Sequence, residues 1–335
     1  MENEHHVRLT AAELSQLWSA YQNDTMLTRV LQYFQNVVED PDIQAVIEHG
    51  LNLSQSHIEK LAAFFNMEKY PLPVGFTEDD VNVNAPRLYS DSFMLFYMHQ
   101  AGKLGLNAMS VAVSLSTRSD IYNHFAECLK EYIQLHKQTT DLLLSKGLYI
   151  RSPHLPTPRG VDFVDKKRFL SGFGNQRPLV SLEVANLFDN IQRNALGAST
   201  VMGFSQVAKS RKIAKYMVKG KEIAEKHVEI FGSELRKDDL NVPMSWDLDV
   251  TDSTVSPFSD KLMMFHTTAL IAIGIGYYGT SMATSLRSDL TADYARLMAE
   301  ISKYAAEGAT LMIENGWMEE PPQAADRHEL VREQK

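Results

Sequence analysis

Residues 43–65, IQAVIEHGLNLSQSHIEKLAAFF, decide the fold because the chain contains a second version of them at residues 213–235, IAKYMVKGKEIAEKHVEIFGSEL. The shared pattern is G-x6-H-I-E from Gly50 to Glu59 and G-x6-H-V-E from Gly220 to Glu229. Self-similarity over a long period predicts that one structural unit occurs twice in tandem.

Apolar residues recur at helical spacing on both sides of the first copy. Residues 67–89 interrupt this period, because they are rich in proline, asparagine and acidic residues, and they predict a long connection. Thr10 with Glu13 forms a capping-box start, and Gly147 supplies a left-handed stop. The first half is therefore expected to contain four helices, at residues 11–38, 41–66, 90–116 and 118–147.

The second half repeats this plan with an offset of 170 residues, which falls to 169 after a one-residue deletion in the long connection. In that connection Pro243 and Trp246 match Pro73 and Phe76. Short, long and short connections between four helices are typical of a bundle with one crossover. The sequence thus predicts an all-α chain of two tandem ferritin-like four-helix bundles, each with a long crossover between its second and third helices. The predicted parts are bundle one (1–150), a linker (151–178), bundle two (179–322) and a tail (323–335).

Composition narrows the classes of function. The 335 residues carry a net charge of −9, which gives no basic surface for nucleic acid, so no nucleic-acid partner is expected. The single cysteine, Cys128, allows no intramolecular disulfide and is expected to be a buried, inert thiol. The first residues lack the pattern of a secretory signal, so a cytoplasmic location is expected.

One apolar stretch tests this expectation. Residues 262–286 contain no Lys, Arg, Asp or Glu, and the length of this stretch alone would allow a membrane span. We expect a buried core helix and no transmembrane segment, because the stretch carries His266, several Ser and Thr, and three glycines.

The repeated histidine is the main candidate for chemistry. His57 lies on the buried stripe of the second helix, and the antiparallel fourth helix places Glu131 within about 3 Å of the same axial level. The same argument pairs His227 with Glu300. His124 has no histidine counterpart in the second half and is interpreted as an ordinary surface or core residue.

These pairs support two interpretations. A ferritin-type dinuclear centre needs Glu-x-x-His motifs, but Ser54 and Ala224 stand three residues before the two histidines. A weaker metal site for iron, manganese or zinc, with ligands His57, Glu131, His227 and Glu300, stays open. The alternative is that each glutamate satisfies a buried histidine and fixes helix register. Glu13 and Glu183 fall in first helical turns and are expected to be caps.

The crossover Pro73-x-Gly75-Phe76, the Ser90-Asp91 cap and the Lys146-Gly147-Leu148 stop give the chain a family resemblance over about residues 9–322. It resembles the family known as domain of unknown function 3231, whose members are similar to ferritin-like proteins of spore-forming bacteria and, more distantly, to spore coat proteins of the coat-F type. The resemblance implies the tandem fold and an association with spores, and no catalytic residues follow from it.

The sequence is therefore compatible with three functions. The first is a non-catalytic structural or interaction protein linked to sporulation, with protein partners or self-association. The second is a metal-binding protein or oxidase with one degenerate site in each bundle. The third is a small-molecule carrier with an apolar cavity in bundle two, near Gly274 and Gly276.

Overall fold

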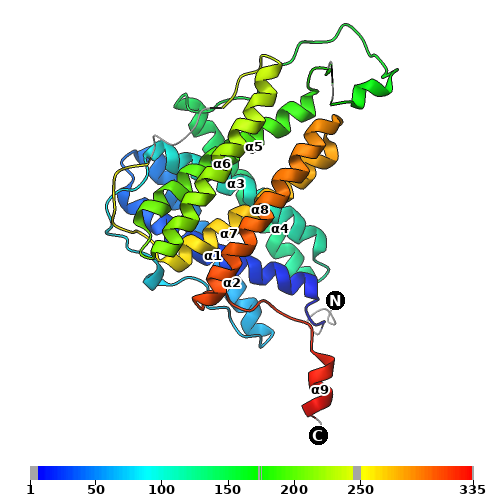
Figure 1. Ribbon diagram of the computed structural model, residues 1–335. Helices are drawn as coiled ribbons and strands as arrows, with labels where there is room; N and C mark the ends of the chain where they lie inside the picture. Colours follow the sequence, from blue (N-terminus) through cyan, green and yellow to red (C-terminus); the bar gives the residue numbers. More distant parts are fainter. Residues whose placement is uncertain (1–6, 173, 175, 244–249, 334–335) are drawn as a thin grey trace.

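The computed structural model describes residues 7–172, 174, 176–243 and 250–333 (Figure 1). The predicted architecture is confirmed, with two tandem four-helix bundles and a crossover between the second and third helix of each. The first bundle contains α1 (Ala11–Val37), α2 (Pro41–Met67), α3 (Asp91–Leu115) and α4 (Ser119–Ser145). The second contains α5 (Ser181–Val207), α6 (Arg211–Lys237), α7 (Asp260–Thr284) and α8 (Ser288–Glu314).

Among the described residues, three short elements lie outside the bundles: η2 (Glu78–Asp80), η3 (Lys167–Leu170) and α9 (Arg327–Glu333). The helix α9 was not expected from the sequence, and it extends away from the bundles beside the C-terminus (Figure 1). The predicted match of Trp246 with Phe76 lies outside the described residues.

Helix ends follow the local chemistry of the sequence. The capping box of Thr10 and Glu13 is present, and Gly147 ends the first bundle with a φ of 68° that a side chain would disfavour. Glu13 also accepts hydrogen bonds from the backbone N–H groups of Thr117 (2.9 Å) and Arg118 (2.8 Å), and it is buried. The cap of α1 therefore also fixes the corner before α4.

The two crossovers pair with each other. The N–H of Asn82 donates to the carbonyl of Pro257 (2.8 Å), and the N–H of Thr251 donates to the carbonyl of Leu88 (2.9 Å). Isolated antiparallel bridges accompany these bonds at Val81 with Phe258 and at Tyr89 with Val250. The long connections thus join the bundles, because each satisfies backbone groups of the other.

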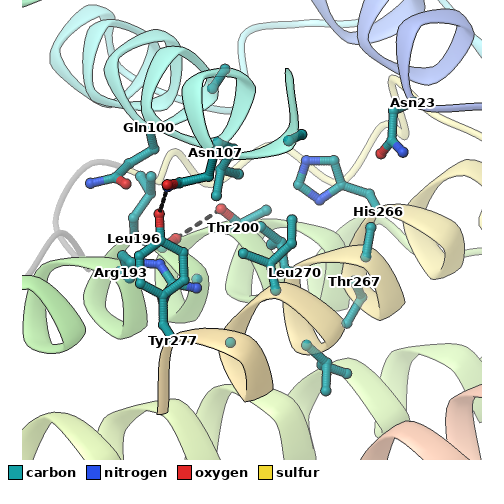
Figure 2. Close-up of a pocket in the computed structure, with 18 of the residues that line it drawn as sticks. Asn23, Gln100, Asn107, Arg193, Leu196, Thr200, His266, Thr267, Leu270 and Tyr277 are labelled. Carbon is teal, nitrogen blue, oxygen red and sulfur yellow. Dashed lines mark hydrogen bonds between the residues drawn. The ribbon is translucent and has the colours of Figure 1, made fainter. Parts of the chain in front are cut away.

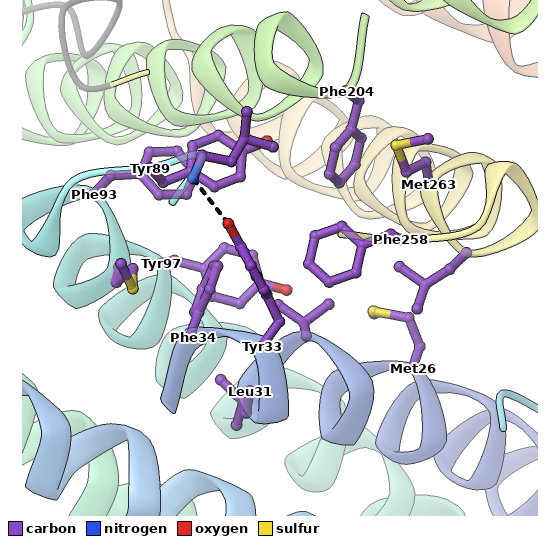
Figure 3. Packing of buried hydrophobic residues seen from close by; sticks show 14 of the residues in the cluster. Met26, Leu31, Tyr33, Phe34, Tyr89, Phe93, Tyr97, Phe204, Phe258 and Met263 are labelled. Carbon is purple, nitrogen blue, oxygen red and sulfur yellow. Dashed lines mark hydrogen bonds between the residues drawn. The ribbon is translucent and has the colours of Figure 1, made fainter. Parts of the chain in front are cut away.

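A shared aromatic core lies beneath the paired crossovers (Figure 3). The Phe258 ring packs edge to face on Tyr33 of α1, with centroids 5.3 Å apart, and on Phe204 of α5, at 6.0 Å. Tyr89 donates from its hydroxyl to the carbonyl of Thr200 (2.7 Å). Side chains from both halves of the chain therefore form one continuous core.

The glycine of the repeated pattern has a packing role. A Cβ at Gly220 would overlap the hydroxyl of Tyr304 on α8, and a Cβ at Gly308 would overlap the hydroxyl of Tyr216 on α6. The two tyrosine rings stack at 4.2 Å, and each hydroxyl donates to the backbone carbonyl of the other tyrosine. In the first bundle, Gly50 instead leaves room for Met98.

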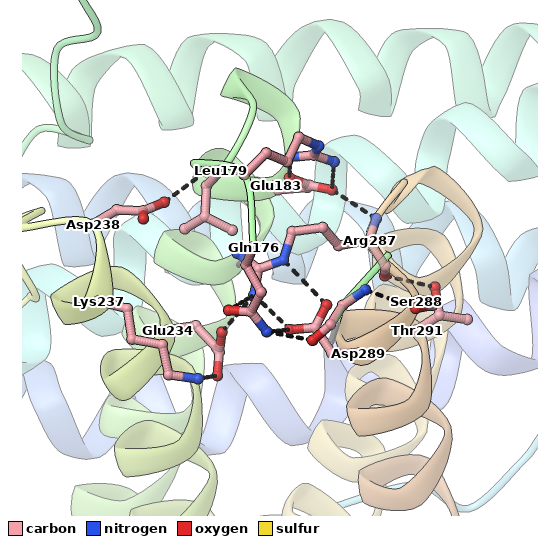
Figure 4. A network of polar contacts seen from close by, with 12 residues as sticks. Gln176, Leu179, Glu183, Glu234, Lys237, Asp238, Arg287, Ser288, Asp289 and Thr291 are labelled. Atoms are coloured by element: carbon pink, nitrogen blue, oxygen red, sulfur yellow. Dashed lines mark hydrogen bonds and ion pairs between the residues drawn. The ribbon is translucent and has the colours of Figure 1, made fainter. Parts of the chain in front are cut away.

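A buried arginine organises the corner between α7 and α8 (Figure 4). Arg287 is 1% exposed and pairs with Glu234 of α6 (3.0 Å) and with Asp289. Gln176, at the end of the linker, accepts a hydrogen bond from the same guanidinium (3.1 Å). The end of the linker is therefore anchored to the second bundle, although residues 154–168 are exposed.

Candidate functional site

The predicted histidine–glutamate pairs are both neighbours in the structure. Nε2 of His57 lies 2.7 Å from a carboxylate oxygen of Glu131, and Nε2 of His227 lies 3.1 Å from one of Glu300. Both histidines are buried. The axial arithmetic from sequence thus located the pairs correctly, and their role as metal ligands stays a prediction.

The first bundle adds groups that the sequence did not single out. Asp24 of α1 lies 3.6 Å from Nδ1 of His57, so carboxylates flank both ring nitrogens. Ligand atoms of His57, Cys128 and Glu131 lie within 4.8 Å of one another. His124 stands one helical turn before Cys128, with ring nitrogens 3.8 and 3.9 Å from its sulfur. We name Asp24, His57, Cys128 and Glu131 the His57 centre.

The second bundle lacks the counterparts of the Asp24 carboxylate and the Cys128 thiol. Asn194 stands where the first bundle has Asp24, and Leu297 stands where it has Cys128. His227 is instead held by the hydroxyl of Tyr278, 2.9 Å from Nδ1, and Tyr278 accepts a hydrogen bond from Asn194 (2.7 Å). The equivalence of the two predicted sites is therefore lost at the level of side chains.

The pKa values of the two histidines are shifted in opposite directions. Burial opposes the charged form of His57, but the interactions with Asp24 and Cys128 outweigh it and raise the pKa of His57 to about 11. At His227 burial outweighs the hydrogen bond with Glu300, and the pKa is lowered. At neutral pH the first bundle thus holds an imidazolium between carboxylates, and the second holds a neutral imidazole.

This difference predicts an unusual pH dependence for the metal-free protein. The folded pKa of His57 lies above the 6.5 of an ordinary histidine, so between these values the folded state binds one more proton than the unfolded state. The stabilisation by His57 should be complete below pH 6.5 and should decline by up to about 1.4 kcal/mol per pH unit as pH rises toward 11.

Urea unfolding of the wild type and His57→Gln at about pH 7 and about pH 9 measures this effect, and the stability gap should be smaller at the higher pH. The matched control is His227→Gln, whose gap should stay constant because His227 is neutral over the whole range. A gap at His57 that does not change with pH would contradict the assignment of a buried imidazolium.

A larger feature lies between the bundles, where a cavity of about 560 Å³ opens (Figure 2). Its lining comes from α1 and α3 of the first bundle and from α5 and α7 of the second, with smaller contributions from α4, α6 and α8. It reaches solvent beside Asn23 and Val111, which are both exposed. The expected apolar cavity thus exists, and Gly274 lines it although Gly276 does not. Placing it inside bundle two was wrong, because α1 and α3 of the first bundle supply part of its lining.

The cavity explains the composition of α7. In the described chain α7 is the one helix long and apolar enough to cross a membrane, and 33% of its apolar window is buried. The expectation of a helix buried on all sides is therefore not met. Leu270, Ile273 and Tyr277, which are only partly buried, face the inter-bundle cavity instead.

Comparison with known proteins agrees with the tandem organisation. The chain matches the family described as protein of unknown function (DUF3231) over residues 1–161 and again over residues 167–330. The chain belongs to the DUF3231 family. Each match covers one bundle, so the duplication seen in the sequence is a duplication of the family's unit.

One solved structure is similar to part of this DUF3231 chain. It is named a "putative spore coat protein" from Bacillus halodurans C-125, with 20% identity and a TM-score of 0.42 over 46% of this chain and 100% of the other. No protein of curated function matches the chain.

Proposed function

We propose that this DUF3231 protein binds an apolar small molecule in the cavity between its two bundles. The observation that carries the proposal is the size and lining of that cavity. Its volume of about 560 Å³ falls within the ~300–1,000 Å³ of small-molecule sites, and apolar side chains with a few polar groups line it, as is typical of such sites. No catalytic role is assigned to the lining residues.

The duplication supports this function physically. A single bundle presents the apolar residues of α3 or α7 to solvent, whereas two bundles joined at their crossovers enclose a space between these faces. Small residues on α3, α5 and α7 keep the space open: they include Ala101, Ala108, Gly197, Ala269 and Gly274. A filled core would be expected to place larger side chains there.

Two glycines provide a matched test. A Cβ at Gly197, which lines the cavity, would meet no atom within 4 Å, and the same holds for Gly276, which lies outside the lining. Gly197→Phe should therefore direct its ring into the cavity from an unobstructed Cβ, whereas Gly276→Phe adds the same ring to the surface. Titration with the neutral fluorescent dye N-phenylnaphthylamine should show at least tenfold weaker binding, about 1.4 kcal/mol, for Gly197→Phe only. Equal affinity of both variants would contradict binding in the cavity.

Metal binding at the His57 centre is the second candidate function, and the convergence of His57, Cys128 and Glu131 favours it. Imidazole, thiolate and carboxylate together suit zinc, with iron and manganese as alternatives. The residues do not suit a dinuclear centre, because Ser54 occupies the position of the second carboxylate on α2. Asp24 lies on the other side of the ring, 3.6 Å from Nδ1 of His57, where it would orient the imidazole as a hydrogen-bond partner.

Elemental analysis of protein purified without a metal-binding tag tests this candidate. We expect about one metal ion per chain in the wild type and in His227→Ala, and none in His57→Ala, because the second bundle lacks the thiolate and the extra carboxylate. Equal metal content in all three proteins would show that His57 and Glu131 are a structural pair.

We also propose that the protein acts during sporulation or in the spore. This proposal rests on the family resemblance, which implies spore-forming bacteria. Accumulation of the protein in sporulating cells and spores would support the setting, and equal amounts in growing cells would remove it. The expected cytoplasmic location and protein partners are likewise proposals.

A further inference from the structure

We infer that the ligand of the inter-bundle cavity is an amphipathic anion, a carboxylate on an elongated apolar body, and that Arg193 binds its head group. The inference rests on the proposed cavity function and specifies the class of ligand.

The first observation is an arginine without an anionic partner. Arg193 projects from α5 into the cavity lining (Figure 2). Its Nη1 atom is buried and has no hydrogen-bond acceptor among the described residues. The guanidinium lies 3.7 Å above the centroid of the Tyr277 ring, which holds it in place by a cation–π contact. The hydroxyl of Tyr277 is itself engaged by Asn107.

The acidic group one turn away on the same helix already has a partner. Asp189 lies one helical turn before Arg193 and forms an ion pair with Lys103 of α3. Within the described part of the chain, Arg193 has no ion pair. Burial accordingly lowers the pKa of the Arg193 guanidinium. An uncompensated buried charge is costly, and a planar guanidinium is suited to a carboxylate that accepts two parallel hydrogen bonds.

The second observation is the direction of the cavity. The helices α5 and α7 run antiparallel, since Asn194 contacts Tyr278 while Phe204 contacts His266. Phe204 is eleven residues beyond Arg193, so His266 lies about 16 Å farther along the helix axis. Apolar residues line the space between these levels: Leu196, Val201, Leu270, Ile271 and Ile273. The cavity thus offers a cation at one level and a long apolar path away from it.

The far level carries a second polar atom without a partner. His266 is buried, its Nε2 lies 2.7 Å from the hydroxyl of Tyr97, and its Nδ1 has no partner among the described residues. Burial lowers the pKa of His266 to about 4, so the ring is neutral at physiological pH. A neutral ring adds no second charge, and a ligand with one anionic end and an apolar body therefore matches the lining.

A pair of ligands that differ only in the head group tests the inference. Dodecanoate and dodecanol are titrated against wild type, Arg193→Met and Arg296→Met, with displacement of N-phenylnaphthylamine as the readout. Arg296 is the matched control because it is a half-exposed arginine paired with Asp293. We expect wild type and Arg296→Met to prefer dodecanoate by at least tenfold, and Arg193→Met to lose this preference while it binds dodecanol as tightly as wild type.

The possible outcomes distinguish the role of Arg193 from the binding function of the cavity. Equal affinity of the wild type for acid and alcohol, or a preference that persists in Arg193→Met, would overturn the role of Arg193 and leave the cavity function intact. Failure of the wild type to bind dye, acid and alcohol would overturn both. Arg193→Lys keeps the charge and should retain part of the preference, which distinguishes loss of charge from altered packing. Titration with dodecyl phosphate tests whether the head group is specifically a carboxylate. Tighter binding of dodecyl phosphate than of dodecanoate would show that the site prefers a phosphate head group.

Discussion

Substitution of Arg287 by methionine is expected to lower the free energy of unfolding by about 3–5 kcal/mol, because it removes the buried cation that Asp289 and Glu234 share and leaves Glu234 with the half-exposed Lys237 alone. Arg287 is 1% exposed, and its guanidinium pairs with Glu234, which is 6% exposed, and with Asp289 (Figure 4). Methionine fills a similar volume, so the main loss is electrostatic. Urea denaturation followed by circular dichroism measures the change.

The control for this prediction is Arg296→Met. That arginine lies on the surface of the same helix and pairs with Asp293 at 2.8 Å, an exposed ion pair of the kind that contributes about 0–1 kcal/mol. If Arg287→Met proves as stable as Arg296→Met, the buried network does not stabilise the corner between α7 and α8.

Substitution of Phe258 by alanine is the second change with a large expected effect, about 3–5 kcal/mol of unfolding free energy. The ring is 3% exposed and fills the shared core between Tyr33 and Phe204 (Figure 3). Because this core contains side chains of both bundles, we expect both to be destabilised and to unfold in one transition. Differential scanning calorimetry measures the midpoint and the number of transitions.

Phe163→Ala is the matched control, since that ring is 92% exposed in the linker and should change stability by less than about 0.5 kcal/mol. A calorimetric trace of Phe258→Ala in which one bundle melts early and the other keeps its wild-type midpoint would show that the bundles are independent units. The shared core would then contribute nothing to their association.

Helical periodicity, together with the residues that start and stop helices, was sufficient to predict the fold. Glu13 and Gly147 set helix ends by local chemistry, and local chemistry is readable in sequence. The pairing of His57 with Glu131 was also accessible, because helix topology and axial rise determine which residues share a level.

Other parts of the site depended on information that the sequence lacks. The approach of Asp24 to His57 depends on the rotation of α1 about its own axis, which the sequence does not give. Cys128 is buried, as expected, and it faces the same centre because His57 of α2 packs against its helix next to Glu131. The comparison of Asp24 with Asn194 in the aligned repeat was the available signal, since it separates a charged pair from a neutral one.

The cavity could not be located from sequence because it belongs to neither bundle. Its walls are set by the docking of α1 and α3 on α5 and α7, which depends on pairing between crossovers 170 residues apart. The apolar and glycine-rich composition of α7 did indicate open space near Gly274. It did not indicate that the first bundle supplies the opposite wall.

The central claim is that the space between the bundles is a binding site, and a crystal structure of the full chain grown with dodecanoate tests it most directly. We predict an elongated ligand between α5 and α7, with its carboxylate at Nη1 of Arg193 and its chain extending toward His266. A cavity that stays free of dodecanoate at a concentration that saturates the protein in solution, with the ligand bound elsewhere on the surface, would contradict it.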